Sequence, residues 1–222
     1  MQAITGDEAD MNKQTYSMIA AAVLSALPAM GAVTPLDPGQ MVSLSGITHG
    51  EDPSLGGFVA QDYTQDFSII SPTGATFSGK IQSRVSTRHD TGQLDFAWHI
   101  RDTSGVGQIS SVVVTGFQGW DLGVEWRPDG SGDIGPSHAM RTADGVGLGY
   151  LFADDLLFAP DESKFFFART EAMTYDMSGT VTINLLNGES FTLATFAPTV
   201  PTPSGLAMLG MVGLSATRRR RS

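Results

Sequence analysis

Oxygen-bearing side chains occur at every second position, Asp129, Ser131 and Asp133, in a glycine-rich stretch spanning 127–136. In a tight turn this spacing aims alternate side chains and the intervening carbonyls at one point, which suits the hard oxygen ligands of Ca²⁺. The acid that closes an EF-hand loop is absent, because Met140 occupies the twelfth position. The sequence therefore predicts either a free-standing Ca²⁺ loop or a polar turn in which Asp and Gly favour positive φ.

Two features could act on a glycan. Glu125 and Asp95 fall on the polar faces of two expected strands and form the one carboxylate pair suited to glycoside hydrolysis, which needs a separation of about 5 to 9 Å across a cleft. Outward-facing acids are also common on the solvated face of a sandwich. Trp120, between Gly119 and Asp121 at an expected strand end, could stack on a sugar face if it is exposed.

Catalytic motifs are missing from the sequence. The chain has four histidines, and none shows metal-ligand spacing such as His-Glu-x-x-His: His49, His89, His99 and His138. His99 is expected to make a surface charge pair near Asp95 and Asp102. The nucleophile-elbow pattern Gly-x-Ser-x-Gly is also absent. No catalytic residue is predicted, and the chain is not expected to be an enzyme.

Alternation with a period of two predicts the strands that would position these groups. The clearest case is Gly92 to Arg101, in which apolar residues occupy one face: Leu94, Phe96, Trp98 and Ile100. Its expected partner is Phe77 to Val85, joined to it through the turn 89–92, which ends in glycine. Together they predict an antiparallel hairpin with one buried face.

The same period recurs through the rest of the central region. Apolar positions alternate in five further segments: Ile109 to Phe117, Leu122 to Trp126, Leu148 to Phe152, Phe165 to Phe167 and Val181 to Leu185. Asn187-Gly188 is a strong hairpin signal before Phe191 and Leu193. Eight to eleven short strands favour an all-β, antiparallel β-sandwich, with a jelly roll as the leading topology. Trp98, Trp126 and 165–167 are expected in its core.

The C-terminal segment has three parts in a fixed order. They are a Pro-x-Pro turn (Val200, Pro201, Thr202, Pro203), an apolar stretch from Leu206 to Ala216, and a basic cluster (Arg218, Arg219, Arg220, Arg221). Residues 204–217 as a helix would span about 21 Å of the roughly 30 Å of hydrocarbon in a bilayer. The arginines would stay on the cytoplasmic side. The segment predicts a short helix held transiently in the inner membrane.

At these residues the chain resembles the PEP-CTERM sorting signal of Gram-negative bacteria, in a Val-Pro-Thr-Pro variant with Thr202 in place of the usual Glu. The resemblance implies recognition by exosortase, a membrane transpeptidase-like protease, and export to the cell surface, outer membrane or exopolysaccharide matrix. The alternative is an ordinary C-terminal membrane anchor with a basic stop. The region from Val124 to Thr170 also resembles, in pattern, the domain of small PEP-CTERM surface proteins, which have no assigned activity.

The N-terminal region has the features of a secretory signal peptide. A run from Met11 to Tyr16 contains Lys13, and an apolar stretch from Met18 to Leu27 follows as a short helix. Small residues at Ala29 and Gly31 then predict cleavage. Translation could begin at Met1 or at Met11, because the first ten residues carry three acids. A buried helix is the alternative, but Pro28 would interrupt it.

These signals divide the chain into three parts: 1–32 leader and signal peptide, 33–199 secreted domain, and 200–222 sorting signal. The central part contains 20 of the 23 acids and 8 of the 13 bases, which gives a formal charge of −12. Nucleic acid is excluded as an expected partner, because phosphates need Lys and Arg. The chain lacks cysteine, so its stability is expected to come from packing or a bound ion.

The expected function is that of an exported structural or adhesive component of the cell surface or extracellular matrix, processed by an exosortase-type system. One alternative is a carbohydrate-binding module of the exopolysaccharide matrix, with Trp120 exposed beside a groove. The other is a secreted glycan hydrolase, which would require two close carboxylates in a cleft.

Overall fold

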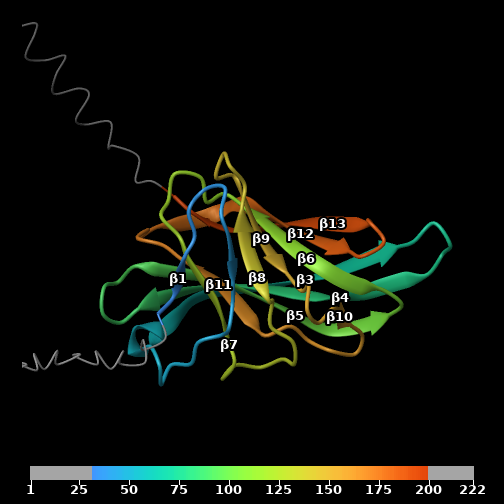
Figure 1. The fold of residues 1–222 in the computed structure, drawn as a ribbon, viewed down its shortest axis with the longest axis horizontal. Helices are drawn as coiled ribbons and strands as arrows, with labels where there is room; N and C mark the ends of the chain where they lie inside the picture. Colours follow the sequence, from blue (N-terminus) through green and yellow to red (C-terminus); the bar gives the residue numbers. More distant parts are fainter. Residues whose placement is uncertain (1–31, 200–222) are drawn as a thin grey trace, which may run out of the picture.

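The structure is a computed structural model that describes residues 32–199 (Figure 1). These residues form two antiparallel sheets, which confirms the all-β, sandwich-like fold. The helical element within them is a single 3-10 turn, η1 (Pro53–Leu55). No helix in this range is long and apolar enough to cross a membrane. The helices expected in the signal peptide and at 204–217 lie outside the described residues.

The first sheet, sheet A, has six strands in the order β1-β7-β11-β5-β4-β3. Their bounds are β1 (Thr34–Pro35), β7 (Gly123–Arg127), β11 (Phe165–Arg169), β5 (Leu94–Gly105), β4 (Thr76–Arg88) and β3 (Gly57–Ile70). The second sheet, sheet B, has the order β13-β12-β6-β9-β8-β2, with β10 paired to β6. Its strands are β13 (Ser190–Pro198), β12 (Tyr175–Leu185), β6 (Gln108–Thr115), β9 (Gly147–Leu151), β8 (His138–Arg141), β2 (Met41–Ser43) and β10 (Leu157–Phe158).

The hairpin expected from the clearest alternation is confirmed as β4 and β5. Phe77, Ile81 and Val85 of β4 are fully buried, and so are the alternating apolar residues of β5. The turn between the strands contains Gly92 at φ 73°. Asn187 and Gly188 likewise lie in the turn that joins β12 to β13. The period of two therefore identified these neighbours and their core-facing residues correctly.

Trp98 of sheet A lies at the centre of an aromatic core and reaches across to sheet B. Its Nε1–H donates to the Thr195 hydroxyl of β13 over 2.8 Å. Thr195 in turn donates to the Ser83 hydroxyl of β4 over 2.9 Å. All three residues are buried, so this chain of hydrogen bonds satisfies the polar groups within the core and ties the sheets together.

Tyr150 of sheet B makes the reverse connection. Its hydroxyl donates to the Phe167 carbonyl of β11, in sheet A, over 2.6 Å. The Tyr150 ring also packs against the Phe166 ring, with 4.7 Å between the two ring centroids. Phe166 in turn stacks on Trp98. Burial raises the pKa of the Tyr150 hydroxyl well above its ordinary value, so this group stays a hydrogen-bond donor.

The three consecutive phenylalanines occupy different faces of sheet A. Phe166 pairs in register with Trp98 and therefore points into the core. Phe165 and Phe167 point to the outer face, although Phe167 is still buried. The expectation that all three are buried in the core was therefore wrong for Phe165, which is only half-buried, because neighbouring strand residues face opposite ways. Phe166 and Phe167 are buried as expected. Trp126, also expected in the core, is half-buried and packs against it.

Both ends of the described chain lie at the same end of the sandwich, on the left of Figure 1. Thr34 of β1 pairs with Val124 of β7. The neighbouring residue Gly123 pairs with Arg169 of β11, which in turn pairs with Asp95 at the start of β5. The first described residues therefore lie beside the start of β5. At the other end of the chain, the Thr199 N–H donates to the Thr174 carbonyl, close to where Ala172 accepts from Leu94 at the start of β5. The opposite end of β5 faces the β3–β4 turn, on the right of Figure 1.

Thr195→Val tests the link between the sheets. The change keeps the shape of the side chain but leaves the buried Trp98 N–H without an acceptor, so we expect a loss of about 1–3 kcal/mol in the free energy of unfolding. Urea unfolding of the full chain measures it. The control is Thr192→Val on the same strand, where the hydroxyl is exposed, and it should change stability by less than about 0.5 kcal/mol. Equal losses in the two variants would contradict a special role for Thr195.

Candidate functional site

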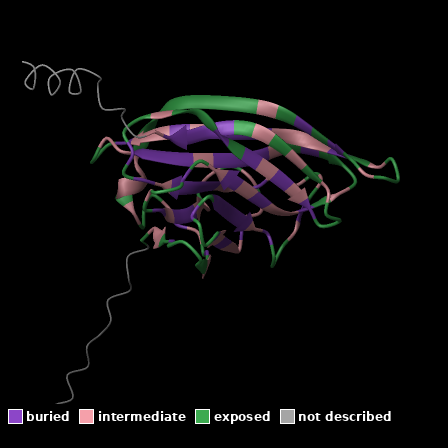
Figure 2. Ribbon diagram, turned by 90° about the horizontal axis from the view of Figure 1, so that it is seen from above, coloured by how far each residue is buried: buried purple, intermediate pink, exposed green. Residues whose placement is uncertain are grey.

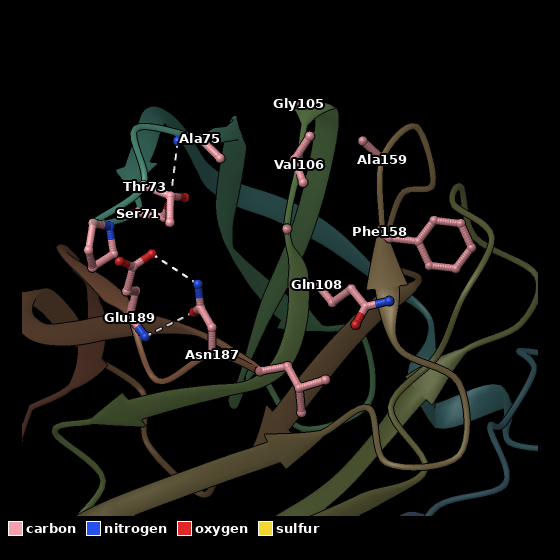
Figure 3. Close-up of a pocket in the computed structure, with 13 residues that line it drawn as sticks. Ser71, Thr73, Ala75, Gly105, Val106, Gln108, Phe158, Ala159, Asn187 and Glu189 are labelled. Carbon is pink, nitrogen blue, oxygen red and sulfur yellow. Dashed lines mark hydrogen bonds between the residues drawn. The ribbon is translucent and has the colours of Figure 1, made fainter.

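A large cavity lies at the end of the sandwich opposite the two described chain ends. It has a volume of about 840 Å³ and is called here the end groove (Figure 3). Four separate segments line it, and its residues are Ser71, Pro72, Thr73, Ala75, Gly105, Val106, Gly107, Gln108, Phe158, Ala159, Leu186, Asn187 and Glu189. The sandwich thus brings the β3–β4, β5–β6 and β12–β13 turns together with the end of β10.

Exposed apolar side chains project at the rim of the end groove. Val106 is 76% exposed, Leu186 59% and Phe158 45%. Figure 3 shows Val106 and Phe158 on separate segments of the groove. Large apolar groups gathered on turns cost solubility unless they contact something, so such a patch is typical of an interaction site.

Polar groups beside these side chains are arranged by local hydrogen bonds. The Asn187 side-chain amide donates to the Glu189 carboxylate over 3.1 Å, and the Glu189 N–H donates to the side-chain oxygen Oδ1 of Asn187 over 3.1 Å (Figure 3). On the facing turn the hydroxyls of Ser71 and Thr73 lie 2.8 Å apart. The end groove therefore offers amide, carboxylate and hydroxyl groups next to an exposed aromatic ring, which is chemistry suited to a sugar or a peptide.

One glycine is required to close the end groove. Gly105 has φ 92°, and a Cβ added there would lie 2.0 Å from the Thr76 carbonyl oxygen. Only glycine allows the β5–β6 turn to approach β4 so closely. The position of Val106, whose N–H donates to the same Thr76 carbonyl, follows from this approach.

The predicted Ca²⁺ loop lies in the connection between β7 and β8. Asp129 accepts two hydrogen bonds from the Arg127 guanidinium, at 2.8 and 3.0 Å, and one from the His49 N–H. Asp133 accepts from the Glu162 N–H over 3.0 Å. The two carboxylates therefore hold different backbone segments. Arg127 holds the pKa of the Asp129 carboxyl down to about 2, with the His49 N–H contributing.

Ser131, the third residue of that loop, opens instead into a smaller cleft on the outer face of sheet A. This outer cleft has a volume of about 280 Å³ and is lined by Leu55, Arg84, Ser86, Asp95, Ala97, Arg127, Gly130, Ser131, Phe165 and Phe167. In residues 32–199 no three His, Cys, Asp or Glu side chains are grouped to hold a metal ion. Binding of Ca²⁺ at this loop stays a prediction, and it would require Asp129 to leave Arg127.

Trp120 is half-buried and packs against the core. It follows β6 at the end of the sandwich that holds the described chain ends, so it does not line the end groove. Its carbonyl oxygen accepts from the buried guanidinium of Arg141 over 2.9 Å, and Arg141 also donates to the Phe117 carbonyl. Through its carbonyl oxygen Trp120 helps to anchor the turn between β6 and β7 to Arg141.

The carboxylates of Glu125 and Asp95 were expected on the solvated outer face; they lie on the outer face, but the structure buries them. Glu125 is only 3% exposed and accepts from the Thr34 hydroxyl and the Gly46 N–H. Asp95 is 9% exposed and pairs with Arg169 at 3.2 Å. Both face the outer side of sheet A, but the segment 46–56 and neighbouring side chains cover that side.

These two acids do not share a cavity. Asp95 lines the outer cleft, whereas Glu125 does not. Strand β11 also lies between their strands, and strands two apart in a sheet are separated by about 10 Å. Burial raises the pKa of each carboxyl, with Arg169 and Arg88 partly offsetting the rise at Asp95. The arrangement is therefore that of two separately satisfied buried acids.

His99 was expected at the surface, and this too was wrong. It is 2% exposed, and its ring lies 4.5 Å from the Phe165 ring. Glu162 is 3.6 Å from its Nε2. Burial lowers the pKa of His99, so the ring is neutral at pH 7. The loops that carry Asp133 and Glu162 cover this part of the sheet.

Sequence reasoning missed the end groove. Its residues come from four segments spread between Ser71 and Glu189, and each segment alone is an ordinary turn. One signal was available: Val106 and Leu186 are large apolar residues at turns, where polar residues are usual. That signal marks each turn but does not indicate that the turns meet.

Asp129→Asn tests the hydrogen bonds of the β7–β8 loop. Because the folded pKa of about 2 lies below the unfolded value of about 3.9, the ionised group stabilises the fold above pH 4 and loses this effect as the pH falls through 2. We expect the variant to be less stable at pH 7 by about 1 kcal/mol or less, since solvent screens this half-exposed pair. Urea unfolding at pH 7 and near pH 2 should show that the difference in stability between the native chain and the variant disappears at the lower pH. A difference that does not vary with pH, or one unaffected by Arg127→Gln, would contradict the assignment.

Comparison with known proteins identifies no relative of this chain, because no family model, curated protein or solved structure matches it.

Proposed function

We propose that this chain is an exported structural or adhesive protein of the cell surface or extracellular matrix, handed to an exosortase-type membrane protease. The observation that carries the proposal is the order of parts in 200–222: the Pro-x-Pro turn, the apolar stretch and the four arginines. A cationic end is retained in the cytoplasm, and a short apolar helix suits a transient stay in the inner membrane. The motif lies outside the described residues.

The geometry of the sandwich supports this reading. Thr199, the last described residue, lies at the end of the sandwich opposite the end groove. A protein held by the residues after Thr199 would present the end groove away from its attachment. Adhesion needs this orientation, because the contacting end must be free to reach a partner.

We propose exopolysaccharide as the partner of the end groove, which brings the carbohydrate-binding alternative into the same account. The exposed Phe158 ring beside side-chain amides and hydroxyls supports it, since sugars are held by stacking and by such polar groups. The formal charge of −12 on the central region favours a neutral glycan over a polyanion. Trp120 has no part in this site.

A glycan hydrolase is the less favoured alternative, because the two acids considered for it open into no common cavity. We accordingly propose no catalytic residue and no bound cofactor beyond the predicted Ca²⁺ at Asp129, Ser131 and Asp133. Two finer structural expectations belong to the same proposal. They are the short helices of the signal peptide and of 204–217, and a jelly-roll relationship for the sandwich.

Intact mass and cell fractionation of the native protein test the proposal. The full chain should yield a surface product shortened near Pro203, whereas a chain that ends at Thr199 should be released unprocessed. The matched control is Pro201→Ala with Pro203→Ala, which keeps the apolar stretch and the arginines and should accumulate uncleaved in the membrane. If the native tail stays attached in the inner membrane, the protein is an anchored periplasmic one and the matrix role must be dropped.

A further inference from the structure

Strand β3 forms a long, open edge of sheet A. It is the longest described strand, with 14 residues, and it stands last in the strand order. Its first eight residues are all exposed, and Figure 2 shows an almost wholly exposed strand along one margin of the molecule. An edge of this length offers a row of backbone donors and acceptors to another strand.

The residues that offer these groups follow from the hydrogen bonds of the β3–β4 hairpin. The Ser71 N–H donates to the Ala75 carbonyl, which makes this a hydrogen-bonded pair. Such pairs alternate along an antiparallel ladder. The odd-numbered residues of 61–69 therefore bond to β4. The even-numbered residues turn their N–H and C=O groups away from it, and they are Asp62, Thr64, Asp66 and Ser68.

The other sheet edges in the described residues are protected. Strand β1 has two residues, one of them Pro35, and β2 has three. Strand β13 ends in Pro198, and its Ala194 carbonyl accepts from the Gln65 side chain of β3 over 2.7 Å. Strand β3 contains neither proline nor lysine, which are two of the usual devices that block pairing.

One of the two charged residues on β3 is paired within its own sheet. Asp62 accepts two hydrogen bonds from Arg84 of β4, both at 2.8 Å. Asp66 stands opposite Lys80 of β4, and the Lys80 ammonium donates to Asp102 of β5. These two acids are the only charged residues in β3. The pairing of Asp62 with Arg84 reduces the repulsion between Asp62 and an incoming strand.

The regular part of β3 is complementary to itself. A bulge near Ala60 interrupts the ladder, and the regular segment that follows, 61–69, is centred on Gln65. Two such segments paired antiparallel about Gln65 place Asp62 opposite Ser68 and Thr64 opposite Asp66. On the other face Tyr63 comes opposite Phe67, whose ring is buried in the core of its own sandwich. Each acid thus faces a hydroxyl that can donate to it, and no acid faces another acid, an arrangement that would destabilise the pairing.

We propose that β3 pairs antiparallel with β3 of a second copy of this chain, in the register centred on Gln65. The self-complementary order of residues points to a second copy, because in this register both acids of β3 meet hydroxyls of the other copy, a match that an unrelated strand would have no reason to make. The two six-stranded sheets would join into one sheet of twelve strands. The two-fold axis would direct the two end grooves in opposite directions, so the dimer could bridge two partners.

Single cysteines test this register cleanly, because the chain has no cysteine of its own. In the proposed dimer Gln65 lies opposite its own copy in a non-hydrogen-bonded pair, with a Cα separation of about 4.5 Å that a disulfide can span. Gln65→Cys in the full chain should therefore form a disulfide-linked dimer on mild oxidation. The matched control is Gln61→Cys on the same face of β3, where the two cysteines would lie about 27 Å apart.

We expect Gln65→Cys to link at least about tenfold faster than Gln61→Cys at equal protein concentration, as read by non-reducing electrophoresis. Adding Thr64→Pro to Gln65→Cys should abolish linking, because it removes an outward N–H and leaves the ladder to β4 intact. Circular dichroism checks that this double variant is folded; if it is not, the two cysteine variants decide the question alone. Equal linking of both cysteines, no linking of Gln65→Cys, or linking that survives Thr64→Pro in folded protein would overturn the proposal.

Discussion

Two buried hydrogen bonds cross between the sheets in opposite directions, and the arrangement of the sandwich depends on them. The Trp98 indole of sheet A donates to Thr195 of sheet B, and the Tyr150 hydroxyl of sheet B donates to the Phe167 carbonyl of sheet A. Their rings pack together with Phe166, so each polar group is held at a defined place in an apolar core. A sheet that slid or rotated would leave both donors unpaired, which costs far more than a displaced apolar contact.

This alignment also determines what lies at the two ends of the sandwich. With the sheets held in register, the β3–β4, β5–β6 and β12–β13 turns meet at one end and form the end groove. The first and last described residues, Ala32 and Thr199, fall at the other end. A chain without cysteine has no disulfide to secure this geometry. The aromatic core therefore supports both the fold and the orientation on which the proposed adhesive function rests.

The sequence predicted the fold class and the core-facing residues of several strands, because alternation reports which side chains share a face. It could not report whether the opposite face is covered. Glu125, Asp95 and His99 were assigned to solvent, yet the segment 46–56 and the loops around Asp133 bury them. Phe165 was placed in the core together with Phe166, because only the register with Trp98 decides which face of the sheet each phenylalanine takes. The end groove was missed since it depends on four segments meeting in space.

The claim that the end groove binds a partner is tested most directly by retention of the protein on isolated matrix polysaccharide. The variant is Val106→Ser with Leu186→Ser, and the control is Met173→Ser, an apolar residue that is 67% exposed at the opposite end. If the end groove is the contact, the double variant should lose about tenfold or more in affinity, since two exposed anchors are removed, while the control binds as the native chain does. Equal binding by all three proteins would contradict this account.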